Sequence, residues 1–256
     1  MVHLRRYVLG SVPMRSVERR LYAVAAMLVA SGVLHLAVFA LGNRPWDGPV
    51  SWRKPATFGL SFGVTLASVV WVTARLRMGS RMRSAALVVF GADCVLEVAG
   101  ITVQAWRDRP SHLNTSTPTD AAIAYTLALG GAVLIVTLGL FAVVAFRGAV
   151  DGPASVLLAY RAGFALLMAA LAAGAAMIAV GTVAMRTGPA ANAYQVTGFL
   201  KGFHAVSLHA VLVLPALARL LETATSDEPL RRRIIRAAVT GYLVAALCIL
   251  AVELLT

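Results

Sequence analysis

The sequence has 256 residues, of which 59% are hydrophobic and only 13% are charged, and its formal net charge at pH 7 is +12. Soluble globular domains carry roughly 25% charged residues, so this composition excludes an ordinary soluble domain and is typical of a protein in a lipid bilayer. The positive charge does not indicate nucleic-acid binding, because the basic residues lie in short segments between apolar runs. The expected partners are the bilayer and its anionic headgroups, with no nucleic acid.

Seven apolar runs are each long enough to cross a hydrocarbon core about 30 Å thick as a helix. Backbone groups in lipid must be hydrogen-bonded within the protein, and the runs lack the alternation of barrel strands, so α-helices are predicted. The predicted spans are 21–41, 56–74, 84–106, 121–146, 162–185, 197–218 and 237–255. The fold class is therefore all-α, a single seven-helix transmembrane bundle over residues 21–256 that follows a basic segment, residues 1–20.

The basic residues predict the orientation of this bundle. Sixteen of them fall in the N-terminal segment and in the connections after spans two, four and six, whereas seven fall on the other side. Lys and Arg accumulate on the cytoplasmic side of membrane proteins, so the N-terminus is expected to be cytoplasmic and the C-terminus extracytoplasmic. The first run has the length of a full span and no cleavage site follows it, so it is interpreted as a retained helix.

Ionisable side chains in the hydrocarbon layer cost several kcal/mol and mark candidate functional sites. The polar side chains of this kind are His35, Asp93, Glu97, Gln104, His204 and His209. Asp93, Glu97 and Gln104 have the spacing i, i+4 and i+11, which places them on one stripe of a helix. His35, Glu97 and His209 are predicted to lie at one depth, roughly 9–13 Å below the outer surface. We therefore expect a His/carboxylate pocket in the extracytoplasmic half.

Two carboxyl groups one helical turn apart in low dielectric should not both be charged, so either one is protonated or the pair binds a cation. Imidazole with carboxylate suits a divalent metal, and two histidines on opposed helices equally suit a b-type haem. The expected metal ligands are His35, Glu97, His204 and His209, with His35 and His209 as axial ligands if the cofactor is haem. In a metal hydrolase Glu97, beside Asp93, is the expected general base.

The histidines of the sixth span need a distorted helix to share one ion. His204 and His209 are five residues apart, about 140° around a regular helix, and Pro215 could provide a kink. The alternative is that His209 faces the core while His204 meets the outer connections.

The outer connections supply a predicted lid over the pocket, made of Lys54, Gln104, His112, Asn114 and Lys201. Thr117 and Asp120 precede an apolar run and are expected to cap the next helix. Trp46 and Trp52 are expected to be anchors at the membrane interface, and Glu253 is expected to lie at the interface too.

Several of these residues form motifs that resemble those of an uncharacterised family of multi-pass bacterial membrane proteins. The motifs are Trp52-x-Lys54-Pro55-x-x-Phe58, Glu97 with Gln104, Ser111-His112-x-Asn114-x-x-Thr117-Pro118, and His204-x-x-x-x-His209 followed by Pro215. The resemblance implies only that these positions belong together, and it implies no particular activity. We expect the protein to lie in the bacterial inner membrane.

A looser similarity is to the ceramidases and adiponectin-type receptors, which are seven-helix membrane hydrolases with a zinc site. Ser31-x-x-x-His35 resembles the first element of that site. The histidine pair departs from the pattern, because it is spaced by five residues rather than four and lies on the sixth span.

Three functions are therefore open. The leading hypothesis is a metal or haem site for redox or hydrolytic chemistry on a small membrane-soluble substrate. The second is a transporter in which Asp93, Glu97 and the histidines relay protons or hold a cation. The third is a non-catalytic membrane partner of another subunit.

Overall fold

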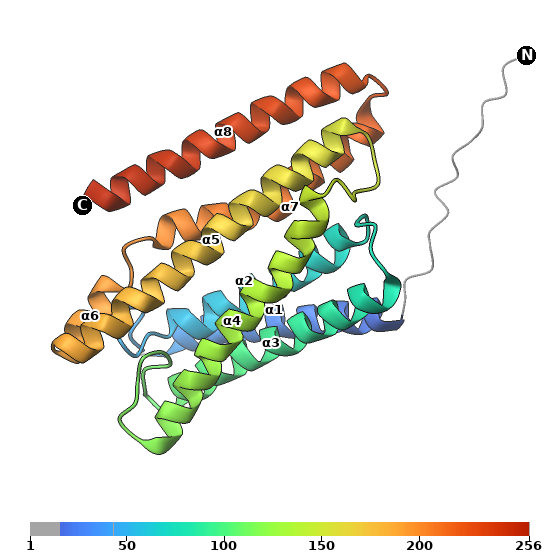
Figure 1. The fold of residues 1–256 in the computed structure, drawn as a ribbon. Helices are drawn as coiled ribbons and strands as arrows, with labels where there is room; N and C mark the ends of the chain where they lie inside the picture. Colours follow the sequence, from blue (N-terminus) through green and yellow to red (C-terminus); the bar gives the residue numbers. More distant parts are fainter. Residues whose placement is uncertain (1–15, 43, 256) are drawn as a thin grey trace, which may run out of the picture.

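The structure is a computed structural model that describes residues 16–42 and 44–255, so most of the predicted N-terminal segment lies outside the described residues. The described part contains eight helices and no strand (Figure 1). Seven are long and apolar enough to cross a membrane, which confirms the predicted all-α seven-helix membrane protein. The helices are α1 (Ser16–Leu41), α2 (Arg53–Thr73), α3 (Ser80–Trp106), α4 (Pro118–Phe146), α5 (Ala154–Thr187), α6 (Ala190–Val196), α7 (Lys201–Ala224) and α8 (Glu228–Leu255).

Six of the long helices begin earlier than the apolar runs that predict them. The largest differences are in α5, which begins at Ala154 rather than 162, and in α8, which begins at Glu228 rather than 237. An apolar run marks only the part of a helix that crosses hydrocarbon, and the helix continues where charged side chains can be solvated. The exception is α7, which begins at Lys201 rather than 197 because the short helix α6 and a turn precede it.

Two pairs of helices pack with their backbones in contact. A Cβ added to Gly32 of α1 would lie 2.6 Å from the backbone nitrogen of Leu60, and one added to Gly59 of α2 would lie 2.7 Å from the nitrogen of Gly32. Helices α5 and α7 approach each other in a similar way, because a Cβ added to Gly163 of α5 would lie 3.1 Å from the Cα of Val211 of α7. Membrane helices associate through such close packing because lipid chains are as apolar as the helices. Moving an apolar side chain from lipid into a helix contact therefore gives no hydrophobic gain.

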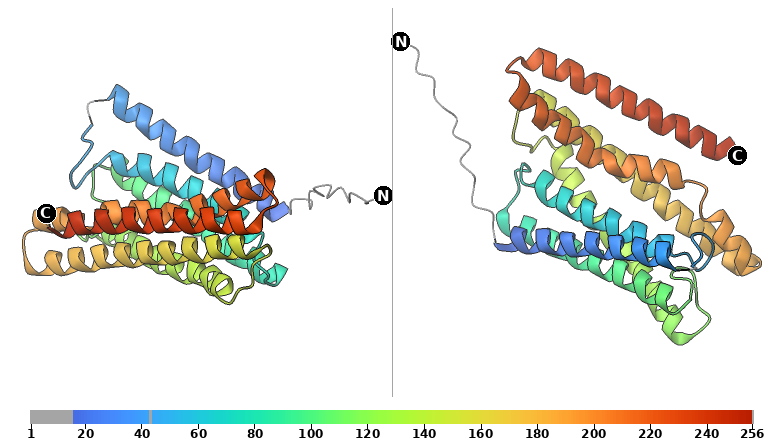
Figure 2. Two further views of the ribbon diagram at one scale, coloured as in Figure 1. Left: turned by 90° about the horizontal axis from the view of Figure 1, so that it is seen from above. Right: turned by 180° about the vertical axis from the view of Figure 1, so that it is seen from behind.

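The remaining long helices are arranged around these two pairs. Helix α3 packs on α2, and α4 crosses between α3 and α5 (Figure 1). Helix α8 lies outside α5 and α7, as Figure 2 shows, and only Ile235 and Ala246 of its side chains are buried. We call the end of the bundle that holds Trp52 and the start of α7 the Trp52 end, and the opposite end the Arg83 end.

Helix α8 is joined to the bundle by a carboxylate near each of its ends. Glu228 accepts hydrogen bonds from the backbone N–H and the hydroxyl of Ser155, at 2.8 and 3.0 Å, in the first turn of α5. Glu253 accepts hydrogen bonds from the backbone N–H groups of Gly202 and Phe203, at 2.5 and 3.0 Å, in the first turn of α7. Each carboxylate satisfies free N–H groups at the positive end of a helix dipole. Glu253, expected simply at the interface, thus has a structural role.

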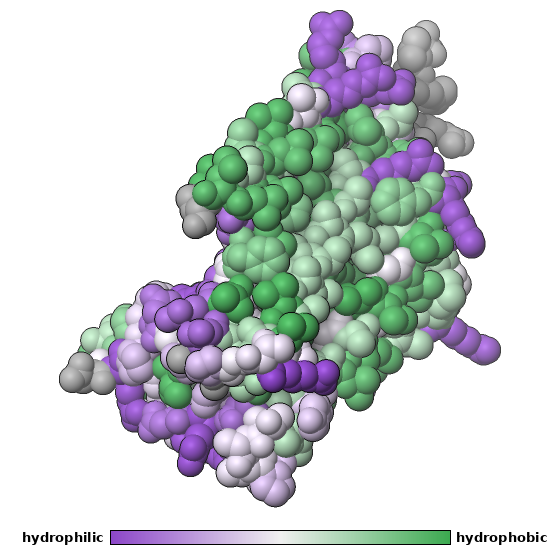
Figure 3. Space-filling view, turned by 60° about the vertical axis from the view of Figure 1, so that its left-hand side comes forward, coloured by the Kyte–Doolittle hydropathy of each residue, from purple (hydrophilic) through white to green (hydrophobic). Residues whose placement is uncertain are grey.

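The outward faces of the helices are apolar. Leu34, Leu129, Val136 and Leu247 are among the large hydrophobic side chains that are more than half exposed. Figure 3 shows this apolar surface along the helices, with hydrophilic residues gathered toward the ends of the bundle. A soluble protein rarely exposes such an area, whereas in a bilayer it contacts lipid chains.

Candidate functional site

Asp93 and Glu97 lie side by side on the face of α3 that packs against α4. Their side chains are 7% and 3% exposed. A Cβ added to Gly130 of α4 would lie 2.8 Å from Asp93 Oδ1 and 2.5 Å from Glu97 Oε1. The two carboxyl groups therefore share one small space, and they fit there because residue 130 has no side chain. The stripe predicted from the i, i+4 spacing is a buried stripe.

Neither carboxyl group has an ion-pair partner among the described residues. Asp93 Oδ2 is also buried without a hydrogen-bond partner in the described chain. Asp93 lies 13 residues from each end of α3, which is about 20 Å of helix in either direction. Two charged carboxylates in such an environment repel each other strongly, so one proton or one cation between them greatly lowers the energy of the pair.

The third member of the stripe, Gln104, has a different environment. Its Nε2 donates to Asp120 of α4 at 3.0 Å, and Asp120 is fully buried. Asp120 also accepts hydrogen bonds from Arg107, Ser116 and Thr117, at 2.9, 3.1 and 2.8 Å. The Thr117 hydroxyl accepts the backbone N–H of Asp120 at 3.1 Å, which is the predicted helix cap. Gln104 thus fixes the connection between α3 and α4.

His35 is buried in an aromatic cluster at the Trp52 end. Its Nδ1 lies 2.7 Å from the carbonyl oxygen of Ser31 and donates to it, and its Nε2 accepts from Trp106 Nε1 at 3.1 Å. Both ring nitrogens of His35 are therefore engaged in hydrogen bonds. Trp52, predicted as an interface anchor, is instead 0% exposed, because its ring packs between His35 and Trp106 and beneath the guanidinium of Arg44.

The two histidines of α7 point to different places. His204 Nδ1 donates to the carbonyl oxygen of Ala170 at 2.7 Å, and the ring packs against Gly174 of α5. His209 is exposed, and its Nδ1 donates to Ala205 of its own helix at 2.6 Å. The alternative that placed His209 toward the core is therefore wrong. The buried side chains of α7 are Ser207, Ala210, Val211, Leu214, Pro215 and Ala218, so His209 lies outside the face that meets its neighbours.

The four predicted metal ligands do not fit a metal or haem centre in this arrangement. His35 has both ring nitrogens engaged, His209 is exposed, and Glu97 faces Gly130. Within residues 16–42 and 44–255, no group of three or more His, Cys, Asp or Glu side chains could hold a metal ion. The geometry gives the predicted cofactor no support.

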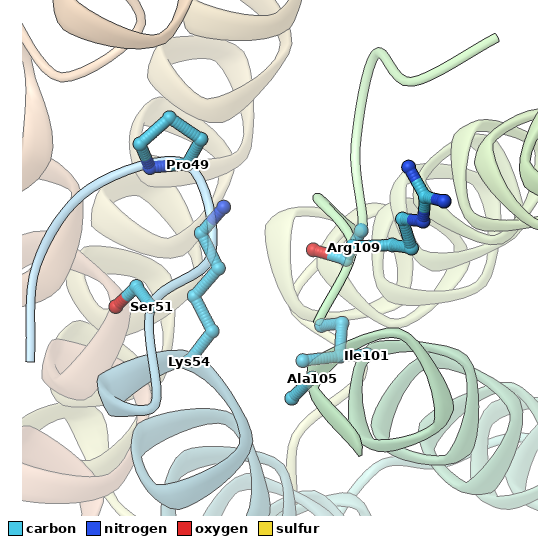
Figure 4. A pocket seen from close by; sticks show the side chains of 7 residues that line it. Pro49, Ser51, Lys54, Ile101, Ala105 and Arg109 are labelled. Atoms are coloured by element: carbon cyan, nitrogen blue, oxygen red, sulfur yellow. The ribbon is translucent and has the colours of Figure 1, made fainter. Parts of the chain in front are cut away.

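Members of the predicted lid gather around a small cavity at the Trp52 end. Lys54, in the first turn of α2, lines it together with Pro49, Ser51, Ile101, Ala105, Arg109 and Ser111 (Figure 4). The cavity volume is about 10 Å³, which is room for one water-sized group. Lys201, at the start of α7, is close enough for its charge to act on Lys54. Lys54 and Lys201, distant in the sequence, are thus brought near each other.

His112 and Asn114 lie in the α3–α4 connection, which also holds the cavity residue Ser111. Burial, and to a smaller extent the charge of Lys54, lowers the pKa of His112 to about 4, so the ring is neutral at pH 7. Its Nδ1 lies 2.9 Å from Ser111 Oγ, and its ring contacts Phe58 of α2. Asn114 accepts the backbone N–H of Ser116 at 3.1 Å and shapes the turn before α4.

No known protein family, curated protein or solved structure matches this chain. The family resemblance drawn from the motifs and the looser similarity to membrane hydrolases therefore stay predictions.

Two features of these sites were missed in the sequence. Gly130 admits the carboxyl pair, and the Gly130–Gly131 dipeptide in the middle of an apolar run was a signal for close packing there. Ser51, Ser111 and Arg109 line the cavity of Lys54. No signal marked Ser51 or Arg109, because polar residues in a connection are ordinarily solvated.

Proposed function

We propose that this protein is a membrane carrier in which the Asp93–Glu97 pair binds and releases a proton or a sodium ion. The single observation that carries the proposal is that both carboxyl groups are buried together while Asp93 Oδ2 has no partner among the described residues. One bound proton or sodium ion leaves the pair with one negative charge instead of two. Ionisable groups at this depth in other membrane proteins mark ion pathways and proton relays.

The orientation of the carrier follows from its basic residues. The Arg83 end holds most of the arginines, so we place it in the cytoplasm and the Trp52 end outside. Toward the Trp52 end the next polar side chain on this face of α3 is Gln104, beyond the buried Ile101. Toward the Arg83 end the buried neighbours on α3, Phe90 and Leu87, are apolar. Buried apolar side chains therefore separate the pair from both ends of α3.

Helix α4 is the element whose movement would open the pair to one side of the membrane or the other. Its Gly130 and Gly131 are adjacent glycines in mid-helix, next to the pair, and glycine is the poorest helix former after proline. It also crosses between α3 and α5 outside the two pairs whose backbones touch. Bending at these glycines changes which end of the bundle reaches the pair, as alternating access requires.

Ion flux in proteoliposomes tests the proposal. Vesicles loaded with a pH-sensitive dye are given a sodium gradient or an acid pulse, and internal pH is followed. The wild-type protein should dissipate the gradient, whereas Glu97→Gln and Asp93→Asn should reduce the flux about tenfold or more, as losses of an essential ionisable group do. Gly130→Ala should reduce it as well, because a methyl group occupies the space of the carboxyl oxygens.

The matched control is Gly139→Ala in the same helix, outside the proposed bend, since a Cβ at Gly139 meets only Met168 Cε, at an ordinary 3.8 Å. It should transport like the wild type and should show a folded monodisperse peak. A Glu97→Gln variant with full flux, or a wild-type protein no faster than empty vesicles under both gradients, would refute the carrier. Ion binding is measured separately by carbodiimide labelling, which modifies protonated carboxyl groups in lipid. Label on Glu97 should decrease when sodium is added.

A further inference from the structure

The side-chain ammonium of Lys54 has no acidic partner in the described chain. Lys54 lines a cavity that has room for one small polar group. Its side chain extends from the start of α2 along the connection from α1, and its ammonium ends near Pro49 (Figure 4). It is partly buried, and its ammonium makes no ion pair or hydrogen bond with a residue of the described chain. A partly buried ammonium normally finds an acceptor, so this arrangement lacks one component.

The acidic side chains near Lys54 at the Trp52 end already bind other basic side chains or backbone N–H groups. Asp47 pairs with Arg53 at 3.1 Å, and Asp120 pairs with Arg107 at 2.9 Å. Glu253 caps α7 through backbone N–H groups. Lys54 is instead surrounded by like charge, because Arg53 and Lys201 both act on it. The local potential is therefore positive at the cavity and favours an anion from outside the chain.

The backbone at the cavity also contributes a positive potential. Helix α2 follows the N-cap residue Trp52, which supplies no side-chain cap, so the positive end of the helix dipole lies beside Lys54. The nearby hydroxyls are mostly used, because Ser51 donates to the carbonyl oxygen of Trp46 at 2.5 Å and Ser111 bonds to His112. The guanidinium of Arg109 points away from Lys54 (Figure 4). Lys54 is therefore the principal donor of the cavity.

We propose that Lys54 binds an oxyanion of the phosphate type, with one oxygen in the cavity and the remainder of the group outside it. The volume of about 10 Å³ accepts one oxygen and excludes the whole anion. The position at the start of a spanning helix is that of the phosphate layer of a bilayer. The same chemistry is offered by an anionic lipid headgroup and by soluble phosphate. This inference does not rest on the proposed carrier function.

Selective acetylation of lysine tests the site, because Lys54 and Lys201 are the only lysines in the chain. The full-length protein is delipidated in an uncharged sugar detergent and treated with an N-hydroxysuccinimide ester, and both sites are quantified by mass spectrometry. Phosphatidylglycerol or inorganic phosphate is then added. Occupied Lys54 should react about fivefold more slowly, as expected when the ligand exceeds its Kd severalfold. The exposed Lys201 in the same molecule reports any general effect of surface charge.

The two sources give different results. Protection of Lys54 by phosphatidylglycerol alone identifies a lipid headgroup, and protection by inorganic phosphate alone identifies a soluble oxyanion. An unchanged ratio of Lys54 to Lys201 labelling with both additions overturns the proposal. Native mass spectrometry gives a second readout, in which Lys54→Gln should lose one phosphatidylglycerol or phosphate adduct that Lys54→Arg and Lys201→Gln retain. Equal adduct numbers in Lys54→Gln and the wild type also overturn it.

Discussion

Two aspartates at the contact between α3 and α4 are buried to a similar degree and have opposite surroundings. Asp120 accepts hydrogen bonds from four side chains, whereas Asp93 keeps one carboxyl oxygen without a partner in the described chain. Native proteins pair nearly all their buried polar groups, and the same two helices do so for Asp120. The difference teaches that the donors around Asp120 build the fold, whereas the unpaired oxygen of Asp93 is the one that the proposed carrier would use for its ion.

The largest effect should come from removing the carboxylate that is fully paired. Asp120→Asn replaces an acceptor of four hydrogen bonds by an amide whose own N–H groups face donors, so we expect the melting temperature to fall by about 5–10 °C. Differential scanning fluorimetry in detergent measures the change. Asp108→Asn is the control, because that aspartate is exposed and forms only a surface ion pair with Arg44. Equal losses in both variants would contradict the comparison.

The same substitution at Asp93 should change the melting temperature in the opposite direction. Asp93→Asn removes a buried charge next to Glu97 without removing any ion pair seen in the described chain, so the melting temperature at pH 8 should rise by about 2–4 °C. The gain in stability should accompany the loss of ion flux. A melting temperature lowered as in Asp120→Asn would show that Asp93 has a structural partner and would remove the contrast between the two sites.

The smallest effect extends the comparison to a buried base. His112 has a pKa of about 4 in the folded protein and about 6.5 in an unfolded chain, so only the unfolded chain takes up a proton between these values. The stability that neutral His112 supplies is complete above pH 6.5 and is lost as the pH falls toward 4. His112→Gln should lose about 2 °C less than the wild type between pH 7.5 and 5. An identical fall in melting temperature in the variant and the wild type would show that protonation of His112 does not contribute to the pH dependence of stability.

Much of the fold could be predicted because the bilayer imposes one strong rule. Runs of apolar residues long enough to span it must be helices, and each of the seven predicted runs lies wholly or mostly within a spanning helix. The buried stripe of Asp93, Glu97 and Gln104 could be predicted for a similar reason, since residues on one helix keep a fixed angular relation.

The meeting of residues on different helices could not be predicted in this way. His35, Glu97 and His209 were placed together by depth alone, and depth does not fix the rotation of a helix about its axis. In water an apolar face must turn inward, but in lipid an apolar helix is solvated on every side, so the sequence of α7 does not favour burial of His209. His35 is instead held by Trp106, from a helix whose approach the local sequence does not encode.

The two carboxylates of α8 fix the positions of α5 and α7 along the membrane normal. Glu228 and Glu253 are separated by 25 residues of helix, or about 38 Å, and they hold the first turns of α5 and α7, which start at opposite ends of the bundle. Sliding α5 against α7 along the membrane normal would break one of these attachments. We therefore expect the protein to prefer one bilayer thickness, and in a thicker or thinner membrane to tilt as a unit rather than shear.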